Sequence, residues 1–127
     1  MPTFMFSVPF IAGKQRPRFA KGHAYKTSDE TLREEAIAMA FDEAGGIAAP
    51  KSVPVYVSIV GLKKKPRQSG EAFTAKPDAD NIAKLVLDAL NGKAWHDDAQ
   101  IVELHVSKDE YTKHVDRILV TINWREE

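Results

Sequence analysis

The chain has 127 residues, of which 43% are hydrophobic, so residues 1–127 are expected to form a single domain with a packed core. Its 18 basic and 18 acidic residues cancel, which argues against a uniformly basic nucleic-acid binder, and the absence of cysteine excludes disulfides and thiolate metal sites. No apolar run is long enough to span a bilayer, and the first residues lack the pattern of a signal peptide. We therefore expect a cytoplasmic protein with no membrane partner.

The first half of the chain alternates between strand-like and helix-like patterns. Residues 4–11 have the pattern of a strand, and residues 13–26 that of a polar loop or ribbon. A capping-box pattern beginning at Thr27 opens a helix, which glycines end at residues 45–46. Alternating valines then predict a strand over residues 53–59.

The second half is expected to contain a loop, a helix and two strands. A charged loop over residues 63–75 leads into a helix over residues 80–91 that has one apolar face. Two alternating runs, 102–107 and 118–124, predict strands, and we expect them to form a hairpin around a turn at residues 109–116. The whole pattern predicts an α+β fold, in which two helices pack on a mostly antiparallel or mixed sheet of about four or five strands.

Basic residues concentrate in two loops, and the first of them, residues 13–26, contains no acidic residue. The first loop carries Lys14, Arg16 and Arg18, and the second carries Lys63, Lys64 and Lys65. A run of lysines can be solubilising only, but these two loops flank the acidic centre of the chain. Phosphate contacts on either side of a metal site would produce this distribution, so we favour DNA contact for both loops.

The acidic centre lies between residues 76 and 100. Asp78 and Asp80 precede the predicted helix, and the pair Asp97 and Asp98 follows it. If the backbone were extended up to residue 80, the first two carboxylates would point the same way, and Asp80 or the next residue would cap the helix. Carboxylates from the two ends of this unit can converge on a hard divalent cation, which prefers oxygen ligands. The pattern alone supports metal binding and ordinary helix capping about equally.

Three further side chains in this unit have alternative roles. Lys84 lies one turn after Asp80 and one turn before Asp88, which fits either an exposed charge ladder or a cation at the scissile phosphate. His96 is next to the acidic pair and is a candidate base or ligand. Trp95 is expected to pack in the core and fix the turn.

In order and spacing, these residues resemble the RusA family of Holliday junction resolvases, which are small homodimeric endonucleases of bacteria and their phages. The resemblance rests on Pro77-Asp78-Ala79-Asp80-Asn81, Lys84, Asp88-Ala89-Leu90, Asn91-Gly92 and Trp95-His96-Asp97-Asp98-Ala99-Gln100-Ile101. The basic segment 13–19 and Lys108 also fit the family pattern. Ala79 and Ile101 depart from the usual Leu and Val, and neither could supply a ligand.

The resemblance implies particular roles for the residues of the unit. It assigns the metal carboxylates to Asp78, Asp80 and Asp98 and the catalytic lysine to Lys84. Supporting or less certain roles fall to Asp97, Asp88 and His96, and Lys76 joins the expected DNA contacts.

The resemblance also implies an activity and partners. The activity would be the Mg²⁺-dependent resolution of four-way DNA junctions in recombination and repair, with Mn²⁺ as a substitute ion. The protein would act as a homodimer in the cytoplasm of a bacterial or phage-infected cell. Three alternatives stay open: a branched-DNA binding protein without cleavage, a nuclease that prefers flaps or forks, and a metal-binding structural protein.

Overall fold

The computed structural model describes residues 3–14, 18–20, 23–25 and 28–125, and gives only the backbone for 18–20 and 23–25. The capping residue predicted at Thr27 lies outside this part of the chain. In the part that is described, no helix has the length and apolarity needed to cross a membrane.

Four strands form the main sheet of the domain. Their spatial order is β1 (Thr3–Val8), β6 (Arg117–Trp124), β4 (Val55–Lys64) and β5 (Ile101–Thr112). Strand β6 pairs antiparallel with both β1 and β4, whereas β4 and β5 are parallel. A separate two-stranded ribbon consists of β2 (Arg18–Ala20) and β3 (His23–Tyr25), within the segment predicted as a loop or ribbon.

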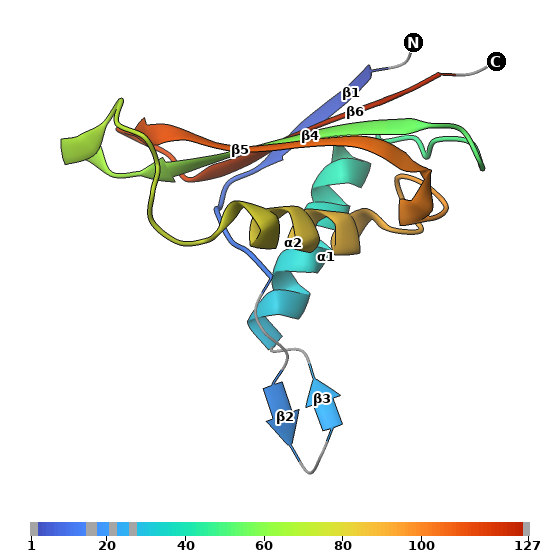
Figure 1. Ribbon diagram of the computed structural model, residues 1–127, viewed down its shortest axis with the longest axis horizontal. Coiled ribbons are helices and arrows are strands. Elements are labelled where there is room, and N and C mark those ends of the chain that lie inside the picture. Colours follow the sequence, from blue (N-terminus) through green and yellow to red (C-terminus); the bar gives the residue numbers. More distant parts are fainter. Residues whose placement is uncertain (1–2, 15–17, 21–22, 26–27, 126–127) are drawn as a thin grey trace.

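Two α-helices cover one face of this sheet, α1 (Ser28–Glu43) and α2 (Ala79–Leu90) (Figure 1). Two short 3₁₀ turns complete the fold: η1 (Pro66–Gln68) follows β4, and η2 (Asp98–Gln100) directly precedes β5. No helix of the described chain covers the opposite face. The predicted α+β class, with a mixed sheet and two helices, is confirmed.

The predicted hairpin of the last two strands is wrong, because β4 lies between β5 and β6. The side-chain amide of Gln100 explains the pairing. It donates to the carbonyls of Pro50 (2.9 Å) and Val53 (3.1 Å), so that β5 begins beside the start of β4. Strands that start at the same end run parallel, and β6 returns on the far side of β4. Alternation along a strand identifies the strand but not its neighbours.

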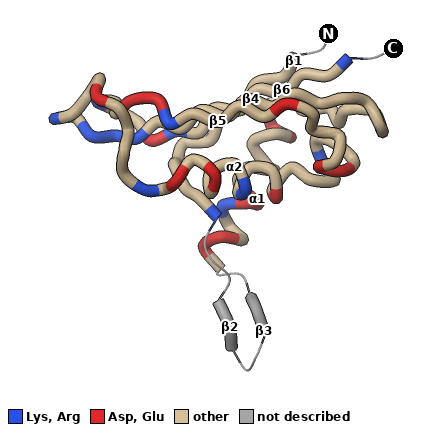
Figure 2. The backbone as a smooth tube through the Cα atoms, viewed as in Figure 1, with Lys and Arg blue, Asp and Glu red and all other residues tan. Residues whose placement is uncertain are grey.

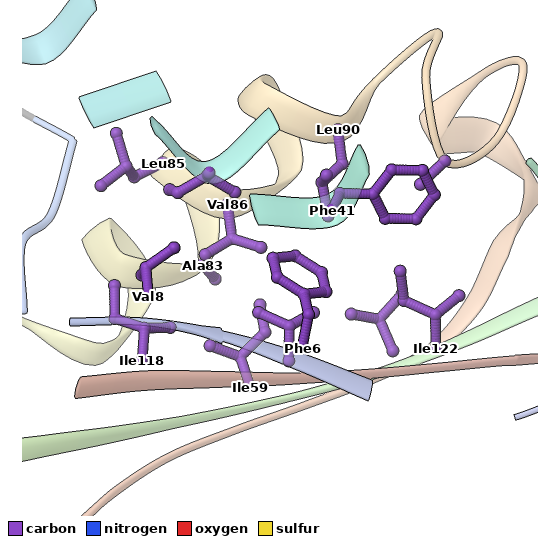
Figure 3. Packing of buried hydrophobic residues seen from close by; sticks show 14 of the residues in the cluster. Phe6, Val8, Phe41, Ile59, Ala83, Leu85, Val86, Leu90, Ile118 and Ile122 are labelled. Carbon is purple, nitrogen blue, oxygen red and sulfur yellow. The ribbon is translucent and has the colours of Figure 1, made fainter. Parts of the chain in front are cut away.

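The core lies between the two helices and the sheet (Figure 3). Helix α2 contributes its whole apolar face, and the fully buried residues on it are Ile82, Leu85, Val86 and Leu90. These residues face inward-pointing side chains of β4 and β6, including Ile59 and Ile118. Burial of four aliphatic side chains, each worth about 2 kcal/mol, fixes α2 against the sheet. Both ends of the helix are therefore held in place.

Candidate functional site

Asp78 begins α2 as its N-cap residue, in place of the Asp80 or Asn81 cap predicted from sequence. Its backbone is extended, and its carbonyl accepts hydrogen bonds from the N–H groups of Asn81 and Ile82, both at 3.1 Å. Its side chain makes no capping hydrogen bond. The carboxylate, about half exposed, is instead held by the ammonium of Lys76, at 2.9 and 3.0 Å.

The charges around Asp78 favour its ionised form. The hydrogen bond from Lys76 lowers the pKa of the Asp78 carboxyl below its ordinary value, and the positive charges of Lys76 and Lys108 lower it further. An ionised carboxylate is the form that binds a metal ion. Asp80 lies exposed in the first turn of α2, where the helix N-terminus also favours negative charge. Because Asp80 is helical, the strand-like alignment predicted for the two carboxylates does not apply.

Asp98 lies beyond the other end of α2, in a turn built from local hydrogen bonds. The indole N–H of Trp95 donates to Asp98 Oδ1 at 2.7 Å, and the backbone N–H of Asp98 donates to Asn91 Oδ1 at 3.1 Å. Trp95 is buried, as predicted, and its N–H also orients the carboxylate. One carboxylate oxygen of Asp98 is thus fixed by a neutral donor.

Asp97 and Gln100 close the same turn. Asp97 accepts a hydrogen bond from the N–H of Ala99 and caps η2, while Gln100 Oε1 accepts from the N–H groups of His96 and Asp97. This capping box gives Asp97 a structural role in the turn. His96 is exposed.

The two acidic groups lie at opposite ends of α2 (Figure 1). A helix of 12 residues is about 18 Å long. In the part of the chain that the structure describes, no three His, Asp or Glu side chains lie close enough to hold one ion. A single chain therefore does not bring Asp98 to Asp78 and Asp80, although we expected the two ends to converge.

Lys84 is exposed on α2 and forms no ion pair with a described residue. The predicted partner Asp88 binds Lys14 instead, with 2.7 Å between Asp88 Oδ2 and Lys14 Nζ. Neither Asp80 nor Asp88 therefore pairs with Lys84, and the structure does not support the charge-ladder interpretation of this lysine. The ammonium of Lys84 is left facing solvent one turn from Asp80.

Lys14, predicted as a phosphate contact, lies among carboxylates. Its ammonium is 3.0 Å from Glu30 and from Glu34 on α1, and 2.7 Å from Asp88 on α2. Partial burial alone would lower the pKa of Lys14, but the hydrogen bonds to Asp88, Glu30 and Glu34 outweigh it and raise the pKa above its usual value. Lys14 thus holds the two helices together.

The other predicted DNA contacts differ in exposure. Lys64, Lys65 and Lys76 are exposed, and Lys63 is partly buried. Figure 2 shows basic residues gathered at the end of the sheet where β4 leads into η1, with acidic residues beside them. Arg16 lies outside the described residues, as does the side chain of Arg18.

A surface cavity of about 340 Å³ adjoins Asp78. Its walls include Lys14, Lys76, Asn81 and Arg33, the last of which comes from α1. Gly13 also lines it, and a Cβ there would lie 2.9 Å from the Cβ atoms of Pro77 and Asn81, so the chain passes this closely only as glycine. Sequence analysis missed Arg33, because it stands among acidic residues of an amphipathic helix and no motif marks it.

The site combines an ionised, half-exposed carboxylate with exposed lysines, as in proteins that act on phosphodiesters. The chain belongs to the RusA endodeoxyribonuclease family: the family model described as Endodeoxyribonuclease RusA matches residues 9–123, most of the chain. The predicted family resemblance is thus confirmed. The chain is also similar to the "Uncharacterized protein YqaN" of Bacillus subtilis (strain 168), with 43% identity over 58 residues. That match covers 43% of this chain and 41% of the length of the relative.

Proposed function

We propose that the protein is a Mg²⁺-dependent endodeoxyribonuclease that resolves Holliday junctions by paired symmetric nicks, in recombination and repair. Membership of the RusA family supports the class of reaction. The observation that carries the proposal is the start of α2, where the half-exposed Asp78 and the exposed Asp80 stand on a helix that the core holds rigidly.

The chemistry of the side chains fits a hard cation. Asp78, Asp80 and Asp98 would supply carboxylate oxygens to Mg²⁺, with Mn²⁺ as a substitute. Such an ion supplies an activated water and neutralises charge on the phosphate. Lys76, which now binds Asp78, would transfer to a DNA phosphate once the carboxylate has its ion. Lys84 would contact the scissile phosphate and offset its developing charge.

A dimer would reconcile the separated carboxylates with a single metal site. A two-fold axis can place the Asp98 end of one protomer beside the Asp78 end of its partner, which one chain cannot do by itself. Two such sites would also explain two symmetric cuts in one junction. The separation of the carboxylates in one chain therefore supports a homodimer.

The decisive experiment compares a synthetic four-way junction with linear duplex, flap and fork substrates in Mg²⁺ and in Mn²⁺. Paired symmetric nicks confined to the junction would support the proposal. Preferred cutting of flaps or forks would show that these, and not four-way junctions, are the substrate. Junction binding with no cleavage in either ion would point to a branched-DNA binding protein. A protein without salt-dependent DNA affinity would instead fit the remaining alternative, a metal-binding structural protein.

The variant Asp80→Asn tests the site itself. We expect it to lose cleavage and to bind the junction as well as or better than the wild type, because a negative charge near phosphate is removed. The control is Glu35→Gln, which neutralises an exposed acid on α1. An Asp80→Asn protein that cuts normally would refute the assignment of the carboxylates.

A further inference from the structure

The segment that leads to Asp78 is fastened to the end of β5. The N–H of Tyr111 donates to the carbonyl of Glu71 at 2.9 Å, and the N–H of Phe73 donates to the carbonyl of Asp109 at 3.3 Å. These bonds lay residues 71–73 antiparallel against β5, which is otherwise the edge of the sheet. The backbone therefore fixes the chain up to Phe73, but not the residues between it and Asp78.

Lys108, on β5, holds the rest of that segment. Its ammonium donates to the carbonyl of Ala75 at 2.7 Å and to the carbonyl of Pro77 at 3.1 Å. It also lies 4.6 Å from the ring centroid of Phe73, over the face of the ring. An ammonium has three N–H donors, and two of them are occupied by backbone carbonyls. Lys108 is thus committed to the segment and is poorly placed to deliver a proton to a substrate.

Tyr111, three residues after Lys108 on β5, completes the attachment of the segment. Its hydroxyl oxygen accepts hydrogen bonds from the N–H groups of Thr74 (3.3 Å) and Ala75 (3.2 Å). Its ring packs on Phe73 with 5.5 Å between centroids, and both rings are buried. We call Phe73, Lys108 and Tyr111 the β5 clamp. The clamp satisfies the polar backbone groups on both sides of Ala75.

We propose that Lys108 is a positioning residue for Asp78: through the clamp it fixes the direction in which the Asp78 carboxylate meets a divalent cation. Asp78 lies between two fixed points, the carbonyl of Pro77 bound by Lys108 and its own carbonyl, bound by the first turn of α2. Without Lys108, the backbone next to Asp78 would be fixed on its helical side alone. This inference rests on the proposed metal-dependent function.

The test compares Lys108→Met, which keeps most of the aliphatic stem but loses the donors and the charge, with Lys108→Arg, which restores donors. The control is Lys113→Met, which removes an exposed lysine just beyond the end of β5. Mn²⁺ affinity is measured by calorimetry, and the Mg²⁺ concentration for half-maximal junction cleavage is measured separately. Metal-free junction affinity and the melting temperature are recorded for each protein.

We expect Lys108→Met to weaken metal affinity about tenfold or more, the usual cost of losing a group that orients a ligand. Metal-free junction affinity should stay within about twofold of the wild type, since an ammonium already bound to carbonyls contacts no phosphate. Lys108→Arg should recover part of the loss, and Lys113→Met should leave the metal dependence unchanged. A role confined to folding would lower the melting temperature and leave the metal dependence of the folded protein unaltered.

A folded Lys108→Met protein with wild-type metal affinity would overturn the inference, and so would a loss that falls only on junction affinity. If Lys108→Met does not fold, Tyr111→Phe decides instead, because it removes one hydroxyl and keeps the ring, and a weaker metal affinity is again expected. A wild-type protein that binds Mn²⁺ but cuts no DNA would refute the proposed function alone, since the calorimetric comparison still tests Lys108. A wild type that binds no Mn²⁺ would refute both.

Discussion

The two ends of α2 each present a carboxylate, but they are built in different ways. At the first end, Asp78 depends on side chains of β5 that are some thirty residues away in sequence, Lys108 and Tyr111. At the second end, Asp98 is oriented by Trp95 and Asn91, which lie within the same turn. The first end is therefore a product of the tertiary fold, whereas the second is a local motif.

This difference determines what each end can tolerate. A local turn with its own capping box should keep its shape wherever the chain places it. The first end should loosen whenever β5, or the contact between the helices, is disturbed. Variants that separate these two kinds of support can therefore test the comparison.

The largest effect is expected from the carboxylates themselves. Asp80→Asn and Asp98→Asn should each abolish cleavage as homodimers. If the two ends meet across a two-fold axis, a heterodimer of these two variants keeps one site in which both ends are intact. That heterodimer should nick one strand of a junction without resolving it, which denaturing gels can distinguish. A heterodimer with no nicking activity would show that both ends act within one chain.

The second-largest effect is expected at the contact between α1 and α2, which supports the first end of α2. Lys14→Met leaves three carboxylates facing one another across the contact between α1 and α2, and we expect a loss of about 3 kcal/mol in the free energy of unfolding. Denaturant unfolding measures it. The control is Lys93→Met, which removes a more exposed ion pair with Asp42 (2.7 Å) and should cost no more than about 0.5 kcal/mol. Equal costs for the two variants would show that the cluster around Lys14 is not a structural centre.

The second end of α2 can be tested by removing a single hydrogen bond, the one from Trp95 to Asp98. Trp95→Phe keeps an aromatic ring in the core and removes the donor to Asp98, so junction cleavage should fall about tenfold with a higher requirement for Mg²⁺. Trp124→Phe removes a similar volume from another buried site on β6, and it should lower the melting temperature without changing the metal requirement. If the two variants behave alike, the effect comes from packing.

The sequence predicted the local features of this molecule well. The bounds of α2, 80–91 by pattern and Ala79–Leu90 in the structure, follow from its apolar periodicity. The predicted burial of Trp95 is also confirmed. The class of fold follows from the count and order of such segments. These features depend on neighbours a few residues away, which a sequence shows directly.

The features that could not be predicted depend on distant partners. Nothing in the alternation of β5 and β6 indicates that β4 lies between them, or that the last turn spans only residues 113–116. The sequence places Lys14 in a basic loop, but only the fold brings it to Glu30, Glu34 and Asp88. The sequence likewise shows two acidic groups with a helix between them, but in the fold the length of that helix keeps the two groups apart.

The smallest effect is expected from the basic residues at the end of β4. Lys63 and Lys64 are the last two residues of β4, before the chain passes through η1 to α2, and they belong to neither kind of support. If both contact phosphate, Lys63→Gln/Lys64→Gln should reduce the slope of log affinity against log salt concentration by about 2 and leave the cleavage rate at saturation unchanged. The control, Lys51→Gln/Arg125→Gln, removes the same charge at the opposite end of the sheet, where β4 begins and β6 ends. Equal slopes for the two double variants would mean that the DNA responds to net charge alone, and that it does not lie preferentially at the Asp78 end.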